Sequence, residues 1–163
     1  MGRVQGKVAF VTGAARGQGR SHAVRLAEEG ADIIAVDLCQ DFATVGYPMA
    51  TPEDLEETAA LVEKTGRSAY TAQADVREAA QLRAALEEGI AQFGHLDIVV
   101  AQAGIAGMKG QPPLQAWVDV INTNLVGTIN AINVSLPHLK EGASIIATGS
   151  TAALMDTSKN DNP

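Results

Sequence analysis

The sequence predicts an α/β fold, a doubly wound parallel sheet with helices on both of its faces. Short apolar runs at residues 8–11, 31–36 and 96–101 alternate with longer segments of helical periodicity. Continuous apolar runs are typical of strands that are covered on both faces. Their regular alternation with helices indicates right-handed βαβ units. Because neither a linker nor an internal repeat interrupts the pattern, we expect a single domain over residues 1–163.

The first run leads into a glycine-rich turn. Residues 8–11 are followed by Gly13, Gly17 and Gly19, and a helix is expected over residues 21–29. Glycine lets the backbone turn tightly and approach a pyrophosphate without Cβ clashes. The helix N-terminus then offers unpaired N–H groups and a partial positive charge to that anion. This order of elements indicates a dinucleotide-binding turn, with a plain tight turn as the alternative.

An acidic residue ends the second run. Residues 31–36 lead into Asp37, roughly 20 residues after the glycine turn, where a carboxylate can accept hydrogen bonds from an adenine-ribose diol. The alternative is a surface aspartate that closes a strand. A 2′-phosphate would be repelled there, and no Arg follows within residues 38–40. We therefore expect NAD to bind better than NADP.

The segment TGAARGQG at residues 12–19, followed by Asp37, resembles the short-chain dehydrogenase/reductase family. The resemblance continues through Asp75, Gly104, Asn124 and Ser150, so it covers nearly the whole chain. It implies a Rossmann-like sheet of order 3-2-1-4-5 and a hydride-transferring oxidoreductase.

A narrower resemblance concerns residues 2–39 together with YPMATPEDL at residues 47–55. These are similar to the mycofactocin-coupled, carveol-dehydrogenase-like branch of that family. The branch implies NAD as cofactor and a small-molecule secondary alcohol or ketone as substrate. The family resemblance also implies a homo-oligomer, specifically a homotetramer.

Composition narrows the possible partners and the compartment. The net charge of −7 argues against nucleic-acid and anionic-membrane binding. No apolar run approaches the roughly 18 residues that a membrane helix needs. The single cysteine, Cys39, excludes an internal disulfide, which fits a cytoplasmic setting. We expect Cys39 to be a small buried residue rather than a catalytic thiol, and we expect no metal site.

The middle of the chain supplies a long loop and a capped helix. Residues 38–51 form a loop that we expect to cover the adenosine half of the cofactor, because long loops in compact domains are often functional. Thr51 is the expected N-cap of the following helix, with Pro52 at its first position. Leu55, Ala59 and Val62 mark its buried stripe, and Gly66 ends it.

The remaining elements continue the alternation. We expect a strand over residues 68–74, a helix over 78–93 stopped by Gly94, and a strand over 96–101. A long helix over residues 114–138, bent near Pro137, precedes a last strand over 143–147. Since ligands bind at the carboxyl ends of such strands, the polar and glycine residues there are the candidate site.

The resemblance assigns roles to these residues. It implies that Asp75 accepts from the adenine amino group; the alternative is an N-cap for the helix with Glu78. Gln102 stands where the family has Asn and is one methylene longer, so cofactor geometry is expected to differ slightly. The implied cofactor-binding residues are Gly13, Arg16, Gly17, Gln18, Gly19, Asp37, Leu38, Asp75, Val76, Gln102, Ala103, Gly104 and Thr148.

Two further residues match the catalytic pattern of the family. Ser150 matches the serine that hydrogen-bonds the substrate oxygen, and Asn124 matches the asparagine of the proton relay. The alternatives are a serine that only turns the chain and an asparagine bonded within the core.

The family's Tyr-x-x-x-Lys motif is missing from the 163 residues, whose two tyrosines are Tyr47 and Tyr70. We therefore expect the natural protein to continue past Pro163 with its last strands and that motif. The chain as given is expected to be inactive and poorly soluble, with Ile145 and Ile146 on an exposed edge strand. The alternatives are a truncated, inactive nucleotide-binding protein and a relative of the sugar-nucleotide epimerases.

Overall fold

A computed structural model describes residues 2–106 and 112–150. The strands are β1 (Val8–Thr12), β2 (Asp32–Asp37), β3 (Ala69–Gln73), β4 (Ile98–Ala101) and β5 (Ser144–Ala147). The main helices are α1 (Gly17–Glu28), α2 (Pro52–Glu63), α3 (Ala79–Phe93), α4 (Leu114–Val120) and α5 (Gly127–Ser135). A π-helix, η1 (Ile121–Val126), joins α4 to α5, and a 3-10 turn, η2 (Leu136–His138), follows α5.

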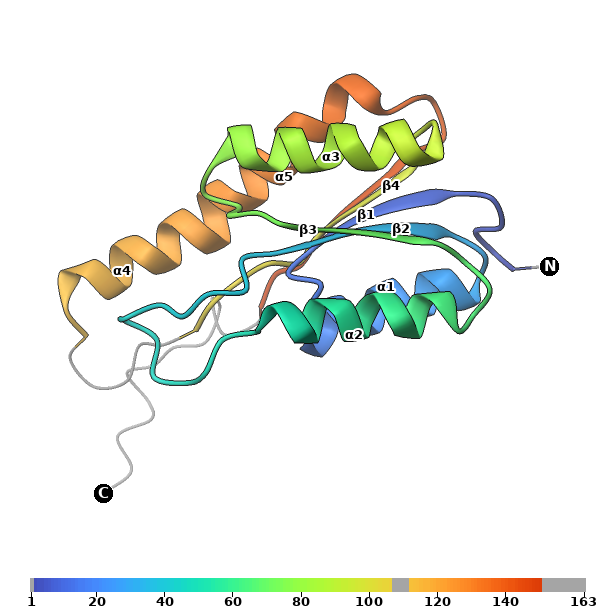
Figure 1. The fold of residues 1–163 in the computed structure, drawn as a ribbon. Coiled ribbons are helices and arrows are strands. Elements are labelled where there is room, and N and C mark those ends of the chain that lie inside the picture. Colours follow the sequence, from blue (N-terminus) through green and yellow to red (C-terminus); the bar gives the residue numbers. More distant parts are fainter. Residues whose placement is uncertain (1, 107–111, 151–163) are drawn as a thin grey trace.

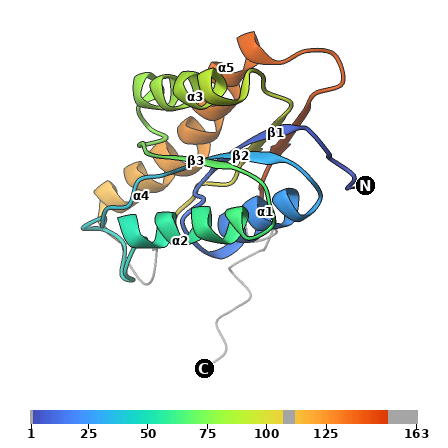
Figure 2. The ribbon, with the colours of Figure 1, turned by 45° about the vertical axis from the view of Figure 1, so that its right-hand side comes forward.

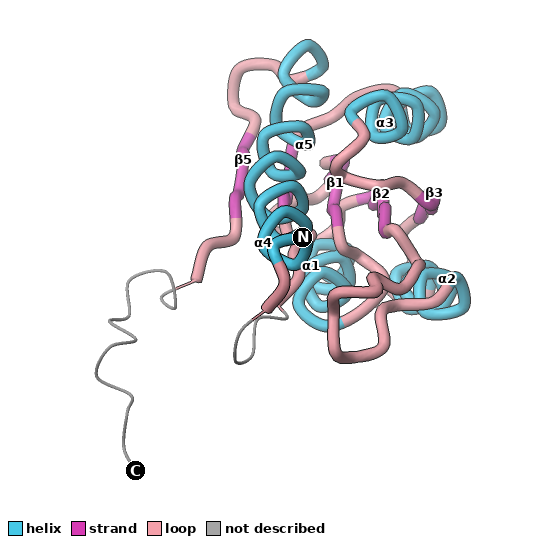
Figure 3. Tube along the Cα trace, turned by 90° about the vertical axis from the view of Figure 1, so that its left-hand side faces the viewer, coloured by secondary structure: helices cyan, strands magenta, loops and turns pink. Residues whose placement is uncertain are grey.

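The five strands form one parallel sheet in the order β3-β2-β1-β4-β5, which confirms the predicted topology. Helices α1 and α2 cover one face of the sheet, and α3 and α5 cover the other (Figures 1 and 2). Seen along the strands, the sheet is the middle of three layers (Figure 3). All strand-to-helix connections therefore leave the sheet at the same edge.

Two apolar clusters form the core, one on each face of the sheet. In β1, Ala9 and Val11 pack with the α1 and α2 side, whereas Val8 and Phe10 pack with the α3 and α5 side. Successive side chains of a strand point to opposite faces, so a strand covered twice must be apolar at every position. All five residues of β1 are buried. This is why the sequence shows continuous apolar runs rather than alternation.

Two of the helical segments differ from the expected ones. Helix α1 begins at Gly17 and not at Ser21, because the glycines themselves form its first turn, one turn before the apolar periodicity begins. The segment 114–138 is helical throughout, as expected, but it contains the π-helix η1 and ends as a 3-10 turn at Pro137. Proline has no N–H to donate, so the regular α-helical pattern stops there.

Strand β5 is an edge strand within the described part of the chain, where it pairs with β4 alone. Its four residues are exposed, with Ile145 at 42% and Ile146 at 47% of full exposure. This confirms the exposed apolar edge expected from the sequence. In the described residues, no helix combines the length and the apolarity that crossing a membrane requires.

Thr51 caps α2 as predicted, and the cap can be tested. Its hydroxyl accepts from Asp54 N at 3.3 Å, while Asp54 Oδ2 accepts from Thr51 N at 2.8 Å. We expect Thr51→Ala to lower the free energy of unfolding by about 1 kcal/mol, since an orphan N–H loses its acceptor. Thr51→Ser keeps the oxygen and is the control. Equal urea midpoints for the two variants would contradict the capping role.

Candidate functional site

The carboxyl ends of the strands border a cleft, and most of the predicted cofactor-binding residues line it. These are Gly13, Arg16, Gln18, Gly19, Asp37, Leu38, Asp75, Val76, Gln102, Ala103 and Gly104. They come from the ends of β1, β2, β3 and β4 and from the start of α1. Residues far apart in the sequence are therefore brought to one edge of the sheet, as a dinucleotide site requires.

The structure favours glycine at the three positions of the turn for different reasons. A Cβ on Gly13 would lie 2.7 Å from Ala103 Cα, and one on Gly19 would lie 1.9 Å from Gly13 O. Both positions therefore require glycine for close packing. Gly17 has a φ of +56°, in the left-handed region, and no described atom lies within 4 Å of its would-be Cβ. Gly17 thus has a backbone conformation that favours glycine at the first position of α1, although it does not itself line the cleft.

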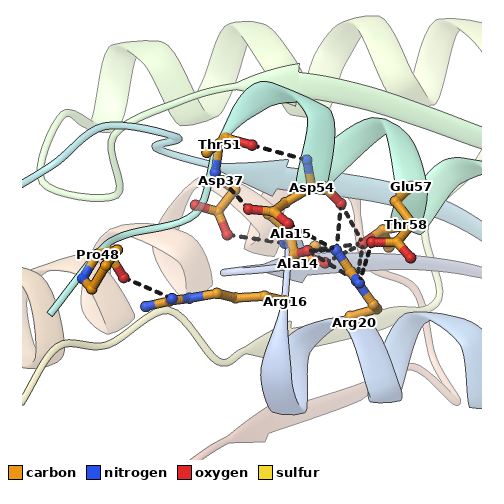
Figure 4. Close-up of polar contacts among 10 residues, drawn as sticks. All are labelled: Ala14, Ala15, Arg16, Arg20, Asp37, Pro48, Thr51, Asp54, Glu57 and Thr58. Atoms are coloured by element: carbon orange, nitrogen blue, oxygen red, sulfur yellow. Dashed lines mark hydrogen bonds and ion pairs between the residues drawn. The ribbon is translucent and has the colours of Figure 1, made fainter.

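Asp37 is buried at the end of β2 and faces the glycine turn. Its Oδ2 accepts from Ala15 N at 3.0 Å, and its Oδ1 accepts from Cys39 N at 3.2 Å (Figure 4 draws the bond to Ala15). Two N–H groups use only part of the acceptor capacity of a carboxylate, which has about four lone-pair sites. The carboxylate is therefore fixed by the backbone and can still accept from a ribose diol.

Asp75 follows β3, is buried and pairs with an arginine. Arg77 donates to both carboxylate oxygens, with Nε 2.9 Å from each and Nη2 2.5 Å from Oδ2. This pairing raises the pKa of Arg77, chiefly through the hydrogen bond. The alternative role as N-cap is wrong, because α3 begins at Ala79 and its N-cap residue is Glu78. Oδ1 of Asp75 instead accepts from Arg77 N at 2.9 Å.

Gln102, the departure from the family pattern, links the ends of three strands. Its Nε2 donates to Gln18 Oε1 at 3.2 Å, and its Oε1 accepts from Thr148 Oγ1 at 2.5 Å. The backbone N–H groups of Gln102 and Ala103 both donate to Thr12 Oγ1 at 3.1 Å. The longer amide thus bridges the glycine turn and the segment after β5, although Thr148 itself does not line the cleft.

The two residues with expected catalytic roles lie beside the cleft and do not line it. Asn124 belongs to η1, where its Oδ1 accepts from Ile105 N at 2.8 Å and its Nδ2 donates to Ile105 O at 2.9 Å. It is exposed, so the alternative of an asparagine buried in the core is wrong. Ser150 follows β5 at the same edge of the sheet and is exposed.

Some lining residues carried no recognisable signal in the sequence. Phe42, Met49, Ala74 and Ile105 also line the cleft. Thr123 also lines it, and its buried Oγ1 has no hydrogen-bond partner within the ranges that the structure describes. A buried hydroxyl without a partner is costly, so this position favours a bound polar group.

The long loop of residues 38–51 contacts the surroundings of the cleft at several points. Arg16 Nη1 donates to Pro48 O at 2.7 Å, and Tyr47 Oη accepts from Ala106 N at 3.0 Å. Thr44 Oγ1 donates to Asp119 Oδ2 of α4 at 2.5 Å. The loop therefore spans from the glycine turn to α4 across the carboxyl edge (Figure 1).

Two aromatic side chains of this loop make cation–π contacts with arginines. The Arg77 guanidinium lies 4.6 Å from the centroid of the Phe42 ring, and that of Arg16 lies 5.6 Å from the Tyr47 ring. Arg16 is the residue before Gly17 of the turn, and Arg77 is the partner of Asp75. The loop is thus attached to both sides of the cleft.

Cys39 is buried beside Asp37, in agreement with the expected small buried residue. Burial, together with the charge of Asp37, raises the pKa of its thiol to about 12. Only the thiolate is a nucleophile, and almost none forms at neutral pH with that pKa. Cys39 is therefore not suited to nucleophilic chemistry.

Residues 7–161 match the family model described as short chain dehydrogenase. The chain belongs to the short-chain dehydrogenase family. An uncharacterized oxidoreductase of Mycobacterium tuberculosis is 49% identical over 161 residues, which are 97% of this chain and 58% of the relative. The (−)-trans-carveol dehydrogenase of Rhodococcus erythropolis is 46% identical over 160 residues, 94% of this chain and 58% of the relative.

Solved structures of short-chain dehydrogenases share the fold. The crystal structure of carveol dehydrogenase from Mycobacterium avium, in complex with NAD, superposes with a TM-score of 0.92 at 47% identity. The superposition covers 96% of this chain and 58% of that one. This short-chain dehydrogenase chain thus spans a little over half the length of the relatives that it matches, and the recognition of the family from TGAARGQG is confirmed.

Proposed function

We propose that this chain forms the cofactor-binding part of an NAD-dependent short-chain dehydrogenase. The reaction is hydride transfer between a secondary alcohol or ketone and NAD. The observation that carries the proposal is the fixed carboxylate of Asp37 beside a glycine turn, at the edge where every strand ends. The similarity to carveol dehydrogenases, one of them crystallised with NAD, supports both the cofactor and the class of substrate.

The residues present fit this cofactor. Gly13, Gln18 and Gly19 line the cleft at the start of α1, where a helix N-terminus can bind a pyrophosphate, and Asp37 retains acceptor capacity for the adenine ribose. Asp75, Val76 and residues 102–104 line the same cleft. We assign the first two to the adenine and the last three to the nicotinamide ribose. When bound, the cofactor would accept a hydride as NAD⁺ or donate one as NADH. The groups of this chain bind and orient it.

The proposed catalytic residues support the reaction from the rim of the cleft. Ser150 would hydrogen-bond the substrate oxygen, and Asn124 would serve the proton relay of the family. The side-chain amide of Asn124 bonds the backbone of Ile105 through one N–H and one lone pair, which leaves a second N–H and a second lone pair for such a relay. A tyrosine and a lysine in the family spacing do not occur in the 163 residues.

We also propose that the protein belongs to the mycofactocin-coupled branch of the family. We expect it to lie in the cytoplasm and to assemble as a homotetramer. Support for self-association comes from α4, η1 and α5, which carry exposed apolar side chains at helical spacing. Trp117 is 48% exposed, Leu125 57% and Ile129 54%. Apolar stripes of this length on a helix are typical of interfaces. A chain that stays monomeric in sedimentation equilibrium would contradict this.

The preference for NAD over NADP tests the role of Asp37. We expect NAD to bind at least about tenfold more tightly than NADP, because a 2′-phosphate would face the Asp37 carboxylate. Asp37→Ala should reduce the difference between the affinities for NAD and for NADP. Glu63→Ala removes a charge from the exposed end of α2 and is the matched control. Equal affinities of the unaltered chain for the two nucleotides, by calorimetry, would contradict the assignment.

The loop of residues 38–51 is proposed to cover the adenosine half of NAD, since it joins Arg16 on one side of the cleft to Arg77 on the other. The backbone amides of this loop should exchange more slowly with solvent once NAD is bound. Amides of residues 64–68, at the opposite edge of the sheet, provide the control. Unchanged exchange in the loop at saturating NAD would show that it does not cover the cofactor.

A further inference from the structure

Two side chains outside the cleft hold the carbonyl groups of the glycine turn. Arg20 of α1 and Thr58 of α2 converge on Ala14 and Ala15, the two residues that follow Gly13 (Figure 4). Neither Arg20 nor Thr58 lines the cleft. Any effect that they have on a bound dinucleotide must therefore pass through the turn.

Arg20 makes a fork of contacts with the turn and with α2. Its Nε and Nη2 donate to Ala15 O at 3.0 and 2.5 Å, and Nη2 also donates to Asp54 O at 2.8 Å. Its Nη1 donates to Glu57 Oε2 at 2.6 Å. The planar guanidinium thus ties one carbonyl of the turn to the first two turns of α2. Its charge is matched by Glu57, and it is not directed into the cleft.

Thr58 completes the arrangement from the buried face of α2. It is fully buried, and its hydroxyl donates to Ala14 O at 2.9 Å, with Ala15 O and Asp54 O both 3.2 Å away. The same oxygen accepts from Arg20 Nε at 3.0 Å. A threonine on a helix face that otherwise packs apolar residues thus serves to satisfy backbone carbonyls.

Every backbone polar group of Ala14 and Ala15 has a partner as a result. Ala14 N donates to Val36 O at 3.1 Å, and Ala15 N donates to Asp37 Oδ2 at 3.0 Å. The carbonyl groups are those held by Arg20 and Thr58. The Ala14–Ala15 peptide group therefore connects Thr58, at the carbonyl of Ala14, with the Asp37 carboxylate, at the N–H of Ala15. Arg20 holds the next carbonyl of the turn, that of Ala15.

We propose that Arg20 and Thr58 are positioning residues for the dinucleotide, which set both the shape of the glycine turn and the placement of Asp37. This inference rests on the proposed function and adds residues that act on cofactor affinity and selectivity without touching the cofactor. Without the pair, the turn between Gly13 and Gly17 loses its only side-chain supports from α1 and α2 among the described contacts. Asp37 then no longer faces the ribose in one fixed position.

The test compares NAD and NADP affinity by calorimetry in four variants of the chain. Thr58→Val removes the hydroxyl at constant shape, and Thr58→Ser keeps it. Arg20→Met removes the fork at a partly exposed position, and Arg25→Met removes a surface arginine from the same helix as the matched control. Circular dichroism and thermal unfolding establish that each variant is folded.

We expect Arg20→Met and Thr58→Val to weaken NAD binding about tenfold, the scale of a lost charged or buried hydrogen bond, and NADP binding less. The ratio of the two affinities should fall, which a change in stability alone would not produce. Thr58→Ser and Arg25→Met should retain both affinities to within roughly twofold, well under the effect of one lost hydrogen bond.

Two results would overturn the proposal in distinguishable ways. If the unaltered chain binds NAD and the folded Arg20→Met variant binds it equally well, the pair is structural only and the proposed function stands. The same conclusion follows if Thr58→Val and Thr58→Ser do not differ. If the unaltered chain binds neither nucleotide, the proposed function is wrong, and the positioning role is wrong with it.

Discussion

The hydrogen bond from Ala15 N to Asp37 Oδ2 is the interaction on which the site depends. It joins the turn after β1 to the end of β2, and thereby holds the Asp37 carboxylate beside the turn that leads into α1, as the proposed dinucleotide site requires. A charge-assisted bond of this kind, shielded from water, is stronger than an exposed one. The contacts of Gln102 with Gln18 and Thr148 extend the same connection along the edge to β4 and β5.

This edge is available for binding, whereas the two faces of β1 and β2 are used in packing against helices. The parallel strands all end on one side, and the glycines and polar side chains that follow them line the cleft at that edge. The long loop after β2 then rests on that edge through Tyr47, Thr44 and Phe42. The fold thus combines a buried apolar core with a partly covered cleft at the carboxyl edge.

Much of this could be predicted from the sequence, because the signals are local. The apolar runs predict the strands, Thr51 with Pro52 predicts the start of α2, and Gly94, with a φ of +88°, predicts the end of α3. What the sequence did not reveal depends on tertiary contacts. The pairing of Arg77 with Asp75, the buried Thr58 and the unpartnered Thr123 each depend on which segments the fold brings together. The π-helix at η1 likewise has no local signal, since every residue in it is compatible with an ordinary helix.

Nuclear magnetic resonance of the ¹⁵N-glycine-labelled chain, titrated with NAD, tests the central claim most directly, because glycines lie at both edges of the sheet. Gly13, Gly17, Gly19 and Gly104 lie at the carboxyl edge, whereas Gly6, Gly30, Gly66 and Gly94 precede the strands at the amino edge. The account predicts saturable shifts of the first group only. Shifts confined to the second group, or an unchanged spectrum at millimolar NAD, would contradict it.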